Sequence, residues 1–202
     1  MMERCSDRVA NLAHILTKNA LRWPERAAIV WEETSWTWSE LDDRVSALSA
    51  ALQNDFGITD GDSILVQAQN SNQMVEIMLA AFRLGALWVP CNFRQAPAET
   101  AYAAQKAKAK LFICDADFGD QAEAVKDARP ELKGTISIGE SSFGTSYEGL
   151  IERHMGKKVP NAPVVHNSAC WLFFTSGSTG RPKAVVLTHG QIGVVVLNHM
   201  CD

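Results

Sequence analysis

Apolar and polar positions in the first part of the chain alternate between helical and strand-like spacing. Apolar residues within 9–20 fall on one helical face, and Pro24 follows where such a helix should stop. The stretch AAIVWEETSWTW (27–38) has two strand-like pieces around a polar turn and predicts a hairpin. A second helix is expected to start with Ser39 as its N-cap and to end at Gly57, because an apolar stripe runs between them.

From residue 63 onwards, short apolar runs alternate with longer helical patterns. The predicted strands are SILVQA (63–68), ALWVPC (86–91), KLFICD (110–115) and GTISIG (134–139), and the predicted helices span 71–85, 97–109, 117–128 and 146–154. This alternation is typical of βαβ units. The sequence therefore predicts an α/β fold with a mostly parallel sheet that helices cover on both faces.

The stretch MGKKVPNAPVVHN (155–167) separates this pattern from the last 35 residues, 168–202. It has two prolines, a basic pair and no periodicity, which favours a surface linker. We therefore expect an α/β subdomain over 1–154 and the start of an incomplete further subdomain over 168–202. A helix over 189–201 is expected to be apolar enough to need cover from later elements.

Composition and charge exclude several classes of protein. The net charge of −4 gives no reason to expect nucleic acid or an anionic membrane as a partner. The start of the chain has no apolar targeting segment, and no stretch is long enough to span a membrane. The five cysteines are odd in number and form no CxxC pair, which is typical of reduced thiols, so we expect a cytoplasmic protein.

The sequence around three cysteines and two histidines predicts whether each is a core residue or a metal ligand. Cys91, Cys114 and Cys170 lie within apolar runs and are interpreted as core residues. His14 and His154 have no partner at ligand spacing, so no metal site is expected from them.

The stretch TSGSTGRPK (175–183) places a loop rich in threonine, serine and glycine between two apolar runs. Because the flanking runs ACWLFF (169–174) and AVVLTH (184–189) are strand-like, the loop is expected to join two strands. A Walker A loop needs the spacing GxxxxGK[ST] and leads directly into a helix. Here Gly177 and Gly180 are three residues apart and a strand follows, so a P-loop NTPase is a poor match.

The residue types in this loop suit a phosphate group. Two glycines allow backbone N–H groups to turn inward around an anion, and four hydroxyl side chains and a lysine add donors and positive charge. A flexible surface turn explains the same composition equally well. The order of the residues decides between these two interpretations.

That order resembles the signature phosphate-binding loop of the adenylate-forming superfamily, which includes acyl-CoA synthetases, luciferases and the adenylation domains of peptide synthetases. The stretches SWTWSELDDRVSALSAAL (35–52), NSNQMVEIMLAAFRLGALWVPCNFR (70–94) and LTHGQI (187–192) also resemble this family, so the likeness covers nearly the whole chain. The NFR at 92–94 is more similar to the acyl- and aryl-CoA synthetase branch. One departure is Ala184, where the family usually has glycine. If the backbone there needs a positive φ, alanine costs about 1 kcal/mol, whereas it is harmless if glycine only provides room.

The resemblance implies an ATP-dependent acid–thiol ligase of fatty-acid or related metabolism. Such enzymes join a carboxylic acid to AMP with release of pyrophosphate and then pass the acyl group to coenzyme A. It implies that the β- and γ-phosphates of ATP would be bound by Thr175, Ser176, Gly177, Ser178, Thr179, Gly180 and Lys183. Magnesium and coenzyme A are implied for the longer parent enzyme, with a fatty or aryl acid as substrate.

The resemblance also implies that this chain is the N-terminal portion of such an enzyme. The segments for adenine, magnesium, most of the acyl pocket and the catalytic lysine would lie beyond Asp202. The 202 residues are therefore expected to hold no complete catalytic site, to bind ATP no more tightly than about 1 mM, and to form no acyl-adenylate. The alternative is a truncated, non-catalytic module that binds a nucleotide or another protein.

Overall fold

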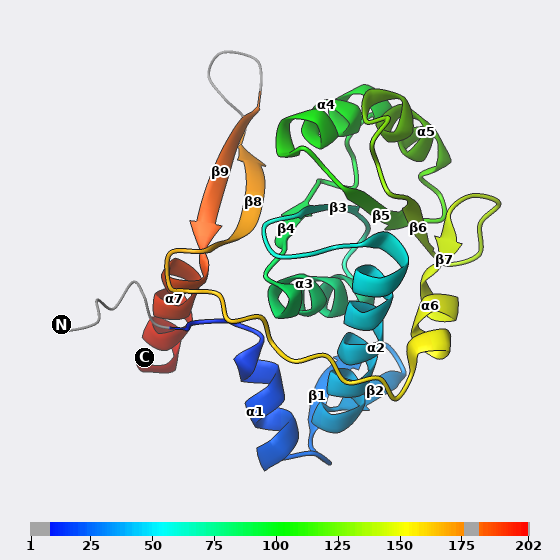
Figure 1. The fold of residues 1–202 in the computed structure, drawn as a ribbon. Helices are drawn as coiled ribbons and strands as arrows, with labels where there is room; N and C mark the ends of the chain where they lie inside the picture. Colours follow the sequence, from blue (N-terminus) through cyan, green and yellow to red (C-terminus); the bar gives the residue numbers. More distant parts are fainter. Residues whose placement is uncertain (1–8, 176–181, 202) are drawn as a thin grey trace.

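The chain forms an α/β fold in the computed structural model, which describes residues 9–175 and 182–201 (Figure 1). The helices are α1 (His14–Arg22), α2 (Trp38–Phe56), α3 (Asn72–Leu84), α4 (Pro97–Ala107), α5 (Gly119–Ala128), α6 (Tyr147–His154) and α7 (His189–Cys201). The strands are β1 (Ala27–Trp31), β2 (Thr34–Thr37), β3 (Ser63–Gln67), β4 (Leu87–Pro90), β5 (Leu111–Asp115), β6 (Thr135–Ile138), β7 (Thr145–Ser146), β8 (Ala169–Thr175) and β9 (Lys183–Thr188).

The main sheet of the described residues has seven strands in the order β7-β6-β5-β3-β4-β8-β9. All neighbours pair in parallel except β8 and β9, which are antiparallel. The strands β1 and β2 form a separate antiparallel hairpin. The predicted α/β class, the mostly parallel sheet and the hairpin at 27–38 are confirmed.

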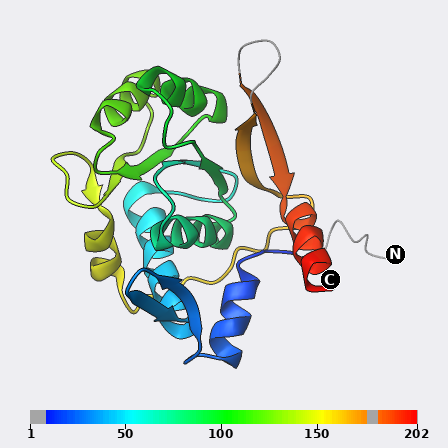
Figure 2. The same cartoon turned by 180° about the vertical axis from the view of Figure 1, so that it is seen from behind.

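Alternate residues of the central strands point into two apolar cores, one on each face of the sheet. Ile64 and Val66 of β3 belong to the core shared with α1, α2, α3 and α6, whereas Leu65 belongs to the core beneath α4 and α5. Figures 1 and 2 show α4 and α5 together on their side of the sheet. Because both faces are covered, β3 is buried along its whole length.

Cysteine positions agree with this packing. Cys91, Cys114 and Cys170 are buried, and burial raises the pKa of each thiol to about 12. Their interpretation as core residues is confirmed.

The start of α2 differs from the prediction. Thr37, not Ser39, is the N-cap: its side chain accepts a hydrogen bond from Glu40 N at 3.2 Å, and Glu40 Oε2 accepts one from Thr37 N at 2.8 Å. This reciprocal capping box satisfies the backbone donors of Thr37 and Glu40 at the start of the helix. The predicted end at Gly57 is confirmed, with a left-handed backbone (φ +63°).

A buried ionic network joins three helices on one face of the sheet. The carboxylate of Glu76 (α3) is fully buried and receives Nε and Nη2 of Arg44 (α2) at 2.9 and 3.0 Å. Tyr147 (α6) donates its hydroxyl to Glu76 at 2.8 Å, and Asn72 donates at 2.9 Å. These hydrogen bonds satisfy the acceptor oxygens of the buried Glu76 carboxylate. Without them, burial of its charge would be strongly unfavourable.

The segment 155–167 lies against the body rather than standing free. Ala162 N donates to Arg83 O at 2.7 Å, Val164 is buried, and Val165 forms a bridge with Val9. Figure 1 shows this segment running beside α1. The division into 1–154, 155–167 and 168–202 stays a prediction.

None of the helices in the described ranges is both long and apolar enough to cross a membrane.

Candidate phosphate-loop site

The predicted phosphate loop connects two neighbouring antiparallel strands. Thr175, the last residue of β8, pairs with Lys183, the first residue of β9, and Thr175 Oγ1 donates to Lys183 O at 3.4 Å. Both residues are exposed. The expectation that two strands flank the loop is confirmed.

The middle of the loop lies outside the described residues. This applies to five of the predicted phosphate ligands, Ser176, Gly177, Ser178, Thr179 and Gly180. The structure therefore places only the two ends of the predicted site, Thr175 and Lys183, and brings them together across the base of the loop.

The loop follows the carboxyl end of a strand that runs parallel to its neighbours. Trp171 of β8 pairs in parallel with Trp88 of β4, and β4 is in turn parallel to β3. Thr175 therefore lies at the edge of the sheet where β3, β4 and β5 also end. Open α/β sheets bind their ligands at this edge.

Ala184 occupies a regular strand position. It pairs with Phe174 in the ladder between β8 and β9. In the described parts of the chain, the residues other than glycine with a positive φ are Glu32 and Lys108. A left-handed backbone therefore does not explain why the family usually has glycine at this position. The explanation that remains is that glycine provides room for a neighbouring group.

His189 anchors the far end of β9, where α7 begins. Its side chain is 1% exposed, and its Nδ1 accepts a hydrogen bond from Leu12 N at 3.2 Å. Its ring meets Phe82 of α3 edge-on, with centroids 5.5 Å apart. Burial lowers the pKa of His189 to about 4, so the ring is neutral near pH 7.

A capping box beside His189 fixes the turn from β9 into α7. Thr188 Oγ1 accepts from Gln191 N at 3.2 Å, and Gln191 Oε1 accepts from Thr188 N at 2.9 Å. No individual role was predicted for Thr188, His189 or Gln191. The spacing Thr-x-x-Gln before an apolar run is the signal that would have found the box.

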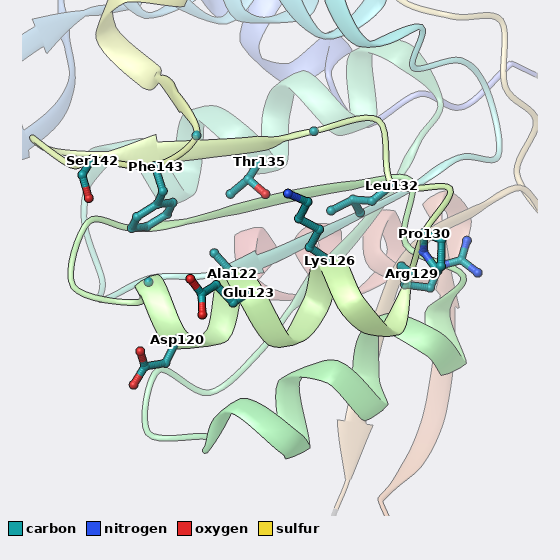
Figure 3. A pocket seen from close by; sticks show the side chains of 13 residues that line it. Asp120, Ala122, Glu123, Lys126, Arg129, Pro130, Leu132, Thr135, Ser142 and Phe143 are labelled. Atoms are coloured by element: carbon teal, nitrogen blue, oxygen red, sulfur yellow. The ribbon is translucent and has the colours of Figure 1, made fainter.

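A pocket lies near the opposite end of the sheet from the phosphate loop. It has a volume of about 570 Å³ and lies between α5, the start of β6 and the loop before β7 (Figure 3). Its strand β6 is four inter-strand spacings from β8, or about 19 Å. The pocket is therefore separate from the phosphate loop. Arg129 in its lining donates to Ala109 O at 3.2 Å and to Glu131 at 2.6 Å.

The described part of the chain was compared with the side-chain groups that hold metal ions in proteins. In residues 9–175 and 182–201, no three His, Cys, Asp or Glu side chains form a group that could hold a metal ion. The described residues therefore do not form a magnesium site of their own.

Comparison with known proteins identifies the family. Residues 16–202 match the sequence model of the AMP-binding enzyme family, and the chain belongs to that family. The fold is that of the N-terminal domains of adenylate-forming enzymes.

Curated relatives include acyl-CoA ligases and an aryl-AMP ligase. The chain is 31% identical to the acyl-CoA ligase sidI of Aspergillus fumigatus over 90% of this chain and 34% of that protein. It is 32% identical to the 2,3-dihydroxybenzoate-AMP ligase of Bacillus subtilis over 87% of this chain and 32% of that protein. The chain thus spans about a third of the length of these relatives.

Solved structures show the same fold. An anthranilate CoA ligase, AuaEII, in complex with anthranoyl-AMP superposes with a TM-score of 0.86 at 21% identity, over 96% of this chain and 37% of that one. VinN in complex with 3-methylaspartate superposes with a TM-score of 0.79 at 28% identity, over 95% of this chain and 52% of that one.

Proposed function

We propose that this chain supplies the phosphate-binding part of an ATP-dependent acid–thiol ligase. In the proposed reaction, the substrate carboxylate attacks the α-phosphate of ATP, pyrophosphate leaves, and the acyl-adenylate then transfers its acyl group to coenzyme A. The substrate is a small carboxylic acid, fatty or aryl. Supporting this class are the names of the relatives, which include acyl-CoA ligases and a 2,3-dihydroxybenzoate-AMP ligase.

One observation carries the proposal: TSGSTGRPK connects two paired strands at the carboxyl edge of the parallel sheet. Backbone N–H groups and hydroxyls in a loop at that edge can surround an anion. Lys183 would add a full positive charge at the base of the loop, opposite Thr175.

The role proposed for Thr175–Lys183 is to hold and orient the leaving pyrophosphate. The substrate carboxylate is itself the nucleophile, so the loop needs no general base. Its contribution is positioning and electrostatic stabilisation of the β- and γ-phosphates. Magnesium and coenzyme A belong to the proposed reaction, and neither is assigned a binding residue in this chain.

Titration with ATP tests the binding role, with Lys183→Ala compared with Lys133→Ala. Lys133 is also exposed but lies beside β6, across the sheet from β9. Wild type and Lys133→Ala should bind equally well, with a Kd no lower than about 1 mM. Lys183→Ala should bind at least about tenfold more weakly, because a charge-assisted contact contributes about 1.5–3 kcal/mol. Equal affinity in all three proteins would exclude Lys183 from the site.

Carboxylate-dependent exchange of pyrophosphate into ATP tests the catalytic part. We expect no exchange from the 202 residues alone with either aryl or alkyl acids, because the chain spans about a third of the relatives' length. Exchange above the background would show that these residues already contain a complete adenylation site.

A further inference from the structure

The pocket beside α5 lies where the edge strand of the sheet is very short. Because β7 has two residues, the space between α5 and the start of β6 is bordered by residues 142–144 of the loop before β7 instead of by a longer strand (Figure 3). The pocket volume of about 570 Å³ lies within the range of small-molecule sites. The pocket is therefore large enough for a small organic ligand.

Ala122, Leu132 and Phe143 give this pocket an apolar side. Ala122 is buried in the core beneath α4 and α5, and Leu132 and Phe143 pack against the same core. An aliphatic chain that lies on these side chains would remove apolar surface from water, which favours binding.

Four charged side chains line the same pocket in a fixed order along α5 and just past its end. Asp120 and Glu123 come first, and Lys126 and Arg129 follow at intervals of three residues. Residues three apart are neighbours on one face of a helix. The formal charges of the four side chains sum to zero, and the other lining residues are not ionisable, so the lining as a whole matches neither a cation nor an anion.

Glu123 and Lys126 are the members of this row that a ligand can contact. Both are exposed, and no ion pair in the described part of the chain involves either of them. Figure 3 shows Lys126 pointing from α5 across the pocket toward Thr135. Arg129, by contrast, donates to Ala109 O and to Glu131. Asp120 lies in the first turn of α5, where the partial positive charge of the helix N-terminus offsets its own charge.

We propose that this pocket binds a linear zwitterion, an ω-amino acid whose ammonium group contacts Glu123 and whose carboxylate contacts Lys126, with its aliphatic chain against Leu132 and Phe143. The Cβ atoms of residues three apart on a helix are about 5–6 Å from each other, so the two charges of the ligand need several methylene groups between them. The proposal is independent of the phosphate loop and of the ligase reaction.

Three probes of similar length separate the contributions. 6-Aminohexanoate has both charges and the aliphatic chain, hexylamine has the ammonium group and the chain, and hexanoate has the carboxylate and the chain. Amide signals of residues 119–129 and 132–144 in the ¹⁵N-labelled chain report binding at low ionic strength. 6-Aminohexanoate should shift these signals in a saturable way. Hexylamine and hexanoate should each bind about two- to fivefold more weakly, because each lacks one exposed ion contact.

Two charge-removing variants should give opposite patterns. Lys126→Gln should abolish the preference for 6-aminohexanoate over hexylamine and keep the preference over hexanoate, and Glu123→Gln should do the reverse. Lys157→Gln removes an exposed lysine outside the pocket and should leave both preferences unchanged. The proposal would be overturned by amide signals that stay unmoved, by hexylamine or hexanoate binding as tightly as 6-aminohexanoate, or by preferences that survive both pocket variants.

Discussion

His189 should make the stability of the fold depend on pH in a defined window. Its ordinary pKa of 6.5 falls to about 4 in the folded chain because the ring is buried. Between these two values the unfolded chain binds a proton that the folded chain does not. The free energy of unfolding should therefore decrease as the pH falls from about 6.5 to about 4.

The size of this effect follows from the pKa difference. A difference between 6.5 and about 4 corresponds to about 3 kcal/mol. His189 as a whole residue is 1% exposed, so solvent screens this effect only weakly. Protonation would also replace the acceptor at Nδ1 with a second N–H facing Leu12 N, 3.2 Å away.

His189→Asn is the matched variant, because its Oδ1 can still accept from Leu12 N without titrating. Urea unfolding, followed by tryptophan fluorescence, should be measured for both proteins from neutral pH down to about pH 4.5. The wild type should lose about 2–3 kcal/mol more than the variant across this range. Curves that stay parallel would refute a buried neutral His189.

Three further substitutions test the packing. Tyr147→Phe removes a hydroxyl that donates to Glu76 at 2.8 Å and should cost about 1.5–3 kcal/mol, lowering the Tm by about 3–12 °C; an unchanged Tm would contradict the buried network. Gly85→Ala should cost at least about 1 kcal/mol in urea unfolding, because φ is +74° and an added Cβ would lie 2.6 Å from Asp60 Oδ1; a neutral result would show that the left-handed turn is wrong. Ala184→Gly should destabilise the chain by about 0.5–1 kcal/mol, because a strand position favours alanine over glycine; a more stable variant would indicate that Ala184 is strained.

Features set by local sequence could be predicted. Gly57 and Gly85 close α2 and α3 because their backbones are left-handed there, and Pro97 opens α4 as expected. The start of α2 differs from the prediction because the capping pair Thr37 and Glu40 prevails over Ser39.

Features set by contacts distant in sequence could not be predicted. The two-residue strand β7 exists only because Thr145 and Ser146 pair with β6. The bonds of Glu76 to α2 and α6, and of Leu12 to His189, depend on how the helices pack. For the candidate site, the apolar runs on either side of TSGSTGRPK were enough to predict the two strands that flank the loop, whereas their antiparallel pairing, which brings Thr175 next to Lys183, is a contact between residues apart in the sequence.

Amide chemical shifts during titration with pyrophosphate and with AMP test the proposed phosphate loop most directly. Because the loop is proposed to hold the β- and γ-phosphates, pyrophosphate should shift the amides of Thr175–Lys183 in a saturable way, and AMP should leave them nearly unchanged. Lys183→Ala should weaken the pyrophosphate response. If AMP and pyrophosphate act alike on these amides, or if pyrophosphate instead shifts residues around α5 and β6, the assignment of this loop is wrong.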